Sequence, residues 1–292
     1  MISIHSLTKR FDNVTAVNNL SIDIHPGING LVGENGAGKS TLLRLIADIY
    51  QASEGEIIID GTPNSSPKIK NNVFLLSDNP MYSNNMTVNS ALRFYSELFE
   101  MDKDKFNEIL LTLDLPRKRK ISTFSKGMKR QLFLAIALSM KAEYILMDEA
   151  FDGIDPIMQD VVKQEIIKFA DTKTFIISSH NLLSLERLCD NFILLSKGRL
   201  AKNGALEDMG TSFRKYQAIF KDDLKEEDFK KVGLDLISFR KVGSITHLVF
   251  ESNKDIEPII KKEFKPTLLE KVELDDDEIF KLEMILSRRE DK

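Results

Sequence analysis

The stretch GENGAGKS, residues 33–40, constrains the fold of this chain more than any other feature. It continues the short apolar run INGLVG and leads into the helical pattern STLLRLIADI. Glycines let a backbone curl so that its N–H groups point at phosphate oxygens, and the N-terminus of the following helix adds positive potential. A strand, this loop and a helix in that order begin a parallel α/β unit. The sequence therefore predicts an α/β fold with a phosphate-binding loop.

The loop also carries two side chains with chemistry of their own. Lys39 is expected to reach the β and γ phosphates of a nucleotide, while the Ser40 hydroxyl is expected to ligate Mg²⁺. A plain glycine turn that meets a helix is the structural alternative, and the lysine and serine disfavour it. The residues predicted to surround the nucleotide are Gly33, Asn35, Gly36, Ala37, Gly38, Lys39, Ser40 and Thr41.

Two carboxylates follow a second apolar run, in YILMDE. Parallel sheets hold their ligands at the carboxyl ends of the strands, which is where Asp148 and Glu149 are expected. Asp148 would hold Mg²⁺ indirectly, and Glu149 would orient or deprotonate an attacking water. Standing alone, the pair would indicate a solvated helix start. His180 ends a further apolar run, FIISSH, and is expected to hydrogen-bond the γ-phosphate and the water.

Periodicity divides the chain into two regions, which we place at residues 1–210 and 211–292. In the first, ISIHSLTKRF and VNNLSIDIHPG alternate apolar and polar residues, which predicts strands. Helical spacing between about residues 80 and 140 predicts a helical insertion between strands, and a later helix is expected around residues 161–169. The second region is richer in charge, and its order of elements predicts a small ferredoxin-like α+β domain.

Composition narrows the cellular setting. A net charge of −4 gives no overall attraction to nucleic acid, and the basic run RKRK at residues 117–120 is more typical of a solvated face. We therefore expect no nucleic-acid partner. A single cysteine, Cys189, is typical of a reducing cytoplasm. No apolar stretch approaches the roughly 20 residues that span a bilayer, so no membrane crossing is expected.

The order of phosphate loop, helical insertion, FSKGM, YILMDEAFDGIDP and FIISSH resembles the nucleotide-binding subunit of an ATP-binding cassette (ABC) transporter, over about residues 1–208. The resemblance implies a P-loop NTPase cassette, which has a RecA-like core with antiparallel β and helical subdomains. It also implies an ATPase that uses Mg²⁺ and dimerises around two ATP molecules.

Further residues take roles only through this resemblance. In FSKGM, Ser125 and Gly127 would contact the γ-phosphate of the ATP held by the opposite subunit, from a helix N-terminus that favours anions. Asp155, in FDGIDP, would couple the two sites across the dimer. Phe11 would stack on adenine, and a place in the strand core is the alternative for it.

Three positions depart from the family pattern. Lys126 stands where glycine is commoner, and Met128 where glutamine is. Ser77, in VFLLSDNPMY, stands about where a glutamine usually contacts Mg²⁺ and relays the nucleotide state to the membrane partner. Ser77 would still reach the metal through water, but its shorter arm would loosen that link. We therefore expect altered Mg²⁺ dependence or slower turnover.

The implied function is that of an ATPase subunit at the cytoplasmic face of a membrane, driving a separate membrane-spanning permease. The subunit would form a homodimer, or a heterodimer with a related ATPase subunit. A groove between the helical insertion and the Ser77 loop would receive a helix of the permease. The signature and the C-terminal region resemble those of exporters of peptides, antimicrobials, drugs or lipid-linked polymers.

Two other functions compete with this one. A soluble ABC ATPase acting on a ribosome or nucleic acid is the first, but the chain lacks the second cassette or the long heptad coils typical of such proteins. A regulatory subunit that binds ATP without hydrolysing it is the second. Glu149 argues against that role, because its carboxylate is the group such subunits tend to lose.

Overall fold

The computed structural model describes residues 1–180, 185, 188–205, 212–252 and 255–290. The chain divides into two compact units, Met1–Leu206 and Glu207–Lys292. The boundary predicted after residue 210 falls within residues 206–211, which lie outside the described residues.

The first unit begins with an antiparallel sheet of strand order β2-β1-β4-β5. Its strands are β1 (Ile2–Phe11), β2 (Val14–Ile24), β4 (Glu54–Ile59) and β5 (Thr62–Pro63). The alternation in β1 and β2 places one side of each strand in the core, as expected for an antiparallel sheet with one solvated face. The strands predicted from ISIHSLTKRF and VNNLSIDIHPG are therefore confirmed.

The second sheet of this unit has the order β10-β9-β3-β8-β7-β6, with β9 to β6 parallel and β10 antiparallel to β9. Its strands are β3 (Ile28–Val32), β6 (Val73–Leu76), β7 (Tyr144–Met147), β8 (Thr174–Ser179), β9 (Asn191–Ser196) and β10 (Arg199–Ala205). Nearly every residue of β3, β7 and β8 is buried, which is typical of parallel strands covered on both faces. The carboxyl ends of β3, β6, β7 and β8 meet at one edge of this sheet, where ligands bind in such folds.

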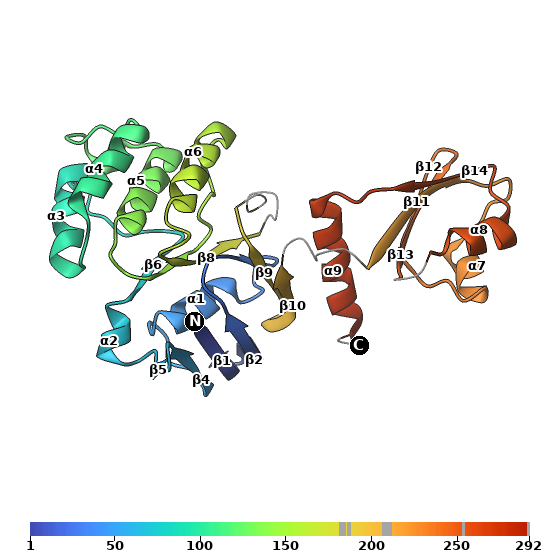
Figure 1. Ribbon diagram of the computed structural model, residues 1–292, viewed down its shortest axis with the longest axis horizontal. Coiled ribbons are helices and arrows are strands. Elements are labelled where there is room, and N and C mark those ends of the chain that lie inside the picture. Colours follow the sequence, from blue (N-terminus) through green and yellow to red (C-terminus); the bar gives the residue numbers. More distant parts are fainter. Residues whose placement is uncertain (181–184, 186–187, 206–211, 253–254, 291–292) are drawn as a thin grey trace. The chain divides into compact units, whose positions relative to one another are not determined.

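Helices lie around the second sheet, and three of them, α3, α4 and α5, form the predicted insertion between β6 and β7. Figure 1 shows this insertion in green at one end of the unit, away from the blue antiparallel sheet. The helices of the unit are α1 (Lys39–Ile46), α2 (Pro67–Lys70), α3 (Val88–Leu98), α4 (Lys103–Thr112), α5 (Lys126–Leu138) and α6 (Pro156–Ile167). A 3₁₀ turn, Ile121–Thr123, precedes α5.

Capping side chains determine where several of these helices begin. Thr87, Asp102, Ser125 and Asp155 each accept a hydrogen bond from a backbone N–H in the first turn of α3, α4, α5 and α6. The helix expected around residues 161–169 therefore begins earlier, at Pro156, since proline suits the first turn of a capped helix.

The second unit is a single antiparallel sheet of order β12-β13-β11-β14 with helices on both faces (Figure 1). Its elements are β11 (Phe213–Ile219), α7 (Glu226–Lys231), β12 (Leu236–Val242), β13 (Ile245–Glu251), α8 (Glu257–Phe264), β14 (Leu268–Val272) and α9 (Asp276–Glu290). Phe229 of α7 and Ile260 of α8 pack into the core on one face, and Leu282 of α9 packs on the other.

Among the described residues of both units, no helix combines the length and the hydrophobicity that crossing a membrane requires.

Two adjacent isoleucines of α8 provide a test of the second core. Ile260 is fully buried, whereas 41% of Ile259 is exposed. Ile260→Ala should lower the free energy of unfolding of the second unit by about 2–5 kcal/mol, because it leaves a cavity. Ile259→Ala should change it by less than about 0.5 kcal/mol. Native-state hydrogen exchange of amides in β11 and β13 measures this unit separately, and equal effects of the two substitutions would contradict the assignment of the core.

Candidate active site

The phosphate loop links the end of β3 to the start of α1, and two of its glycines are required by close backbone contacts. Gly38 has φ +102°, a conformation that suits glycine, and a Cβ there would lie 2.4 Å from the Ala16 carbonyl oxygen. A Cβ at Gly33 would lie 2.5 Å from the Leu195 carbonyl oxygen. The loop is therefore held tightly against β2 and β9 and ends at the N-terminus of α1, which favours anions.

The other predicted loop residues differ in exposure. Asn35 and Gly36 are exposed, while Ala37 is buried and its N–H donates to the Glu34 carbonyl at 3.0 Å. Thr41 lies in the first turn of α1. The predicted loop residues thus occupy one continuous turn.

Lys39 is 5% exposed and lies in the middle of the site. Its ammonium donates to the carbonyl oxygens of Gly33 at 2.7 Å and Glu34 at 3.3 Å. It also lies 3.4 Å from Oε1 of Glu149. The predicted phosphate-binding cation and the predicted catalytic carboxylate are therefore neighbours, although 110 positions separate them in the sequence.

Asp148 provides a buried carboxylate next to the phosphate loop, with 1% of the residue exposed. Its Oδ1 accepts hydrogen bonds from Ser40 Oγ at 3.0 Å and from Ser178 Oγ at 2.7 Å. Arg44 Nη1 lies 3.8 Å from Oδ2. Mg²⁺ prefers oxygen ligands, so the hydroxyl of Ser40 and the carboxylate of Asp148 form a donor set that fits this ion.

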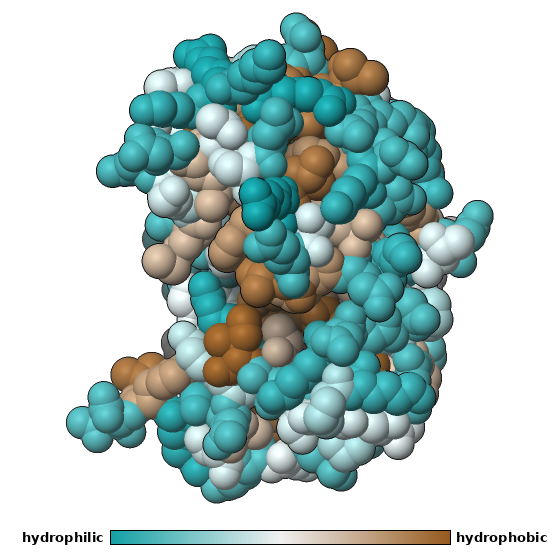
Figure 2. Space-filling view, turned by 90° about the vertical axis from the view of Figure 1, so that its left-hand side faces the viewer, coloured by the Kyte–Doolittle hydropathy of each residue, from teal (hydrophilic) through white to brown (hydrophobic). Residues whose placement is uncertain are grey.

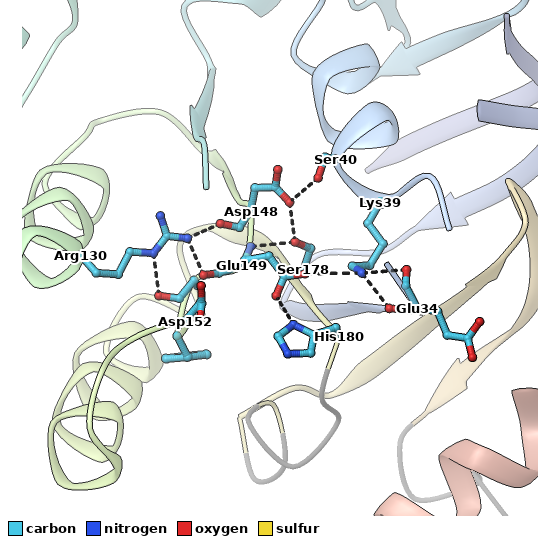
Figure 3. Close-up of polar contacts among 12 residues, drawn as sticks. Glu34, Lys39, Ser40, Arg130, Asp148, Glu149, Asp152, Ser178 and His180 are labelled. Carbon is cyan, nitrogen blue, oxygen red and sulfur yellow. Dashed lines mark hydrogen bonds and ion pairs between the residues drawn. The ribbon is translucent and has the colours of Figure 1, made fainter. Parts of the chain in front are cut away.

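Glu149 follows β7 with a left-handed backbone, φ +50°. One carboxylate oxygen faces Lys39, and the other lies 2.8 Å from Nδ1 of His180 at the end of β8. The Glu149 N–H donates to Ser178 Oγ at 2.8 Å. Figure 3 shows the carboxylate between Lys39 and His180. A cleft of about 180 Å³ lies beside Glu149 and His180, so the carboxylate can meet a water molecule.

The signature segment lies at the start of α5. Ser125 Oγ accepts from the Met128 N–H at 3.1 Å and caps the helix, and Ser125 is itself exposed. A Cβ at Gly127 would lie 2.9 Å from the Gly153 carbonyl oxygen, so the first turn of α5 packs closely on the segment that follows Glu149. The two predicted signature residues thus lie at the start of a helix that packs on the segment following Glu149 in the same chain.

The unusual Lys126 has a partner within the chain. Its ammonium lies 2.7 Å from Oδ2 of Asp152, and its aliphatic stem passes over Gly153. This hydrogen bond lowers the pKa of the Asp152 carboxyl. The extra positive charge in the signature is therefore largely balanced by Asp152.

The remaining predicted residues are Phe11, Asp155 and Ser77. Phe11 ends β1 with 38% of its surface exposed and packs edge-on against Tyr50 at 5.3 Å, which argues against a role in the strand core. Asp155 Oδ1 accepts from the Met158 N–H at 3.1 Å and caps α6. Ser77 directly follows β6, at the same sheet edge as Asp148.

Sequence reasoning missed three residues around the two carboxylates: Ser178 and Arg44 contact the Asp148 carboxylate, and Arg130 binds the main chain of Asp148 and Glu149. Ser178 is a small polar residue inside an otherwise apolar strand, which is a signal that could have been noticed. Arg44 stands four residues after Ser40 and so shares a face of α1 with it. Arg130 is buried, and its guanidinium donates to backbone carbonyls on both sides of Glu149 (Figure 3). Nothing in its sequence context distinguishes it from the neighbouring cations.

Comparison with known proteins agrees with this geometry. The family described as ABC transporter matches residues 17–152. The ABC transporter ATP-binding protein YtrB of Bacillus subtilis (strain 168) is 32% identical over 232 residues, covering 77% of this chain and 78% of that protein. The ABC transporter ATP-binding protein NatA of the same organism is 30% identical over 232 residues, covering 73% of this chain and 93% of that protein.

A solved structure gives the same result for the fold. The dimeric structure of a bacterial ABC transporter cassette matches with a TM-score of 0.63 at 20% identity, covering 70% of this chain and 98% of that chain. The predicted P-loop NTPase fold of the ABC cassette is therefore confirmed. YtrB and NatA are 32% and 30% identical to this chain over most of their length. The chain therefore belongs to the ABC transporter ATP-binding proteins, whose cassettes bind and hydrolyse ATP.

Proposed function

We propose that this chain is the ATP-hydrolysing subunit of a transporter, with Glu149 as the general base. The observation that carries the proposal is the Glu149 carboxylate, held between Lys39 and His180 and next to the buried Asp148. A carboxylate in this place accepts a proton from a water that attacks a phosphate bound at the loop.

The neighbouring residues have distinct tasks in this proposal. Lys39 turns from the loop carbonyls to phosphate oxygens, and His180 orients the water and Glu149. Ser40 would hold Mg²⁺ directly and Asp148 would hold it indirectly, and the bound ion would neutralise charge on the phosphates. Ser178 keeps Asp148 in place through its 2.7 Å hydrogen bond.

A dimer would complete each site. Ser125 lies exposed at the N-terminus of a helix of 13 residues, where the helix dipole favours an anion. We propose that this end of α5 binds the γ-phosphate of ATP held by the opposite subunit, and that Asp155 lies at the same interface. The partner would be a second copy or a related ATPase subunit.

A membrane-spanning permease is the proposed second partner, with this chain bound at the cytoplasmic face of the membrane. A groove of about 810 Å³ is lined by charged and polar residues together with Leu98 at the end of α3, Phe99, Phe74 of β6 and Ile69 of α2. Figure 2 looks onto the side of the first unit where α2 and α3 lie, and it shows hydrophobic residues gathered in a hollow. An amphipathic helix binds in grooves of this kind. This groove is lined by residues of the helical insertion and by Phe74 of β6, the strand that leads to Ser77.

The direction of transport belongs to the same proposal. The signature residues 125–128 resemble those of exporters, so we propose export of cargo that is bound by the permease. A ribosome or nucleic acid as the partner is not favoured, because the similar proteins named above are transporter ATP-binding proteins over most of their length.

Removing the base should stop hydrolysis while ATP still binds. Glu149→Gln should lower kcat by about 10²–10⁴-fold, because a carboxamide cannot accept the proton. The variant should also elute as a dimer when ATP is present. Glu108→Gln is the matched control, since Glu108 is an exposed glutamate of α4 that pairs with Lys105. Hydrolysis by the Glu149 variant at the wild-type rate would refute the assigned base.

Mixing two inactive variants tests whether ATP lies between subunits. Lys39→Ala removes the phosphate-binding ammonium, and Ser125→Asp keeps a capping side chain while it repels the phosphate. In a symmetric dimer, an equal mixture should regain about one quarter of wild-type ATPase activity, because half of the dimers contain one intact site out of two. A mixture as inactive as its components would contradict the shared site.

Capture of the permease tests the groove. Glu149→Gln, expressed with its neighbouring genes and extracted in mild detergent, should copurify with a membrane-spanning protein. Adding Leu98→Asp should abolish copurification, because it places a charge among the apolar residues of the groove, while ATP binding by the chain is unchanged. Leu111→Asp is the control, since Leu111 is 75% exposed on α4 outside the groove. Copurification that survives Leu98→Asp would place the permease elsewhere.

A further inference from the structure

We propose that Arg130 is a positioning residue that holds Glu149 in its working conformation and connects it to the segment at Ser77. The proposal rests on the function of Glu149 proposed above. Arg130 is 5% exposed and stands on the second turn of α5. Because a buried cation requires compensating hydrogen bonds, its partners identify what it holds.

The partners of Arg130 are main-chain carbonyls from two segments that are distant in the sequence. Nε donates to Ala150 at 3.0 Å, and Nη2 donates to Asp148 and Glu149. Nη1 donates to Ser77 at 2.8 Å and to Asp78 at 3.3 Å. A guanidinium offers N–H donors in a rigid planar fork, and this group uses all three of its nitrogens. Burial lowers the pKa of Arg130, an effect opposed by the surrounding carboxylates, and an arginine of this kind stays charged.

The Glu149 backbone needs such support. Its φ of +50° is unfavourable for a residue with a Cβ and persists only where the surroundings enforce it. Arg130 binds the carbonyls of Asp148 and Glu149, one on each side of the strained residue, and Ser178 Oγ binds the Glu149 N–H. These contacts fix both peptide planes and so direct the carboxylate toward His180.

The same guanidinium gives the Ser77 segment a connection that the Ser77 side chain does not need to provide. A shift of the Ser77 or Asp78 carbonyl moves a rigid group that also holds Glu149. Ser125, at the phosphate-binding end, belongs to the same α5. Lysine has neither the planar fork nor the reach to bind both segments, so Arg130→Lys keeps the charge and loses the connection.

A double-mutant cycle with Glu149→Gln tests the role. Rates are measured per ATP-binding site, titrated with a fluorescent ATP analogue, so that unfolded chains do not contribute. Arg130→Lys should lower kcat by about 10²-fold through misplacement of the base, and KM for ATP should stay within about threefold. In the Glu149→Gln background, Arg130→Lys should change the residual single-turnover rate by less than about threefold, because the group it positions is gone.

The outcomes separate positioning from stability. Arg130→Gln, which keeps an amide donor, replaces the lysine variant if that variant does not fold. Lys129→Gln is the matched control, because it removes one positive charge from the residue before Arg130 in α5. The Lys129 ammonium lies over the ring of Tyr82 and binds neither of the two described segments that Arg130 holds, so this variant should leave kcat unchanged. Equal loss of rate in both backgrounds, or a rise of KM with unchanged kcat, would overturn the proposal. The comparison of wild type with Glu149→Gln alone tests the proposed function, so failure of the base is seen separately from failure of Arg130.

Discussion

Buried charge at the carboxyl ends of the parallel strands is the constraint on which the rest of the site depends. Asp148 and Lys39 are 1% and 5% exposed, and a buried charge is tolerated only when hydrogen bonds or an opposite charge replace its lost hydration. The replacements are the hydroxyls of Ser40 and Ser178 and the carbonyl of Gly33. They come from the phosphate loop, α1 and β8, so the order that places β3, β8 and β7 side by side is a requirement of the site's electrostatics.

The segment that carries Glu149 and the anion-favouring N-terminus of α5 lie next to each other in one chain. The segment after β7 carries Glu149, and the first turn of α5 packs on it through the close approach of Gly127 to Gly153 and the ion pair of Lys126 with Asp152. An anion that binds at the N-terminus of α5 therefore acts on a rigid neighbour of Glu149. In the proposed dimer, the ATP of one subunit would in this way influence the base of the other.

The sequence predicted the parts of the site whose chemistry demands particular residue types. Lys39 could be predicted because a glycine-rich loop that leads into a helix is typical of phosphate binding. Glu149 could be predicted because acidic residues directly after an apolar strand are typical of a ligand site at the edge of a parallel sheet. Arg130 could not, because its acceptors are main-chain carbonyls, which leave no trace in the residue types around it. The start of α6 was placed too late because the hydrophobic pattern is weak in its first turn, where Asp155 and Pro156 determine the boundary.

The departures from the family pattern can now be judged together. Ser77 replaces a longer side chain, yet the next residue, Asp78, lies 3.5 Å from Arg44, whose other nitrogen lies 3.8 Å from Asp148. The Ser77 segment is also bound directly through Arg130. Two arginines therefore tie the Ser77 segment to Asp148 and Glu149 whatever the length of the Ser77 side chain. In the proposed function, the connection to the membrane partner would therefore depend on guanidinium groups more than on the Ser77 side chain.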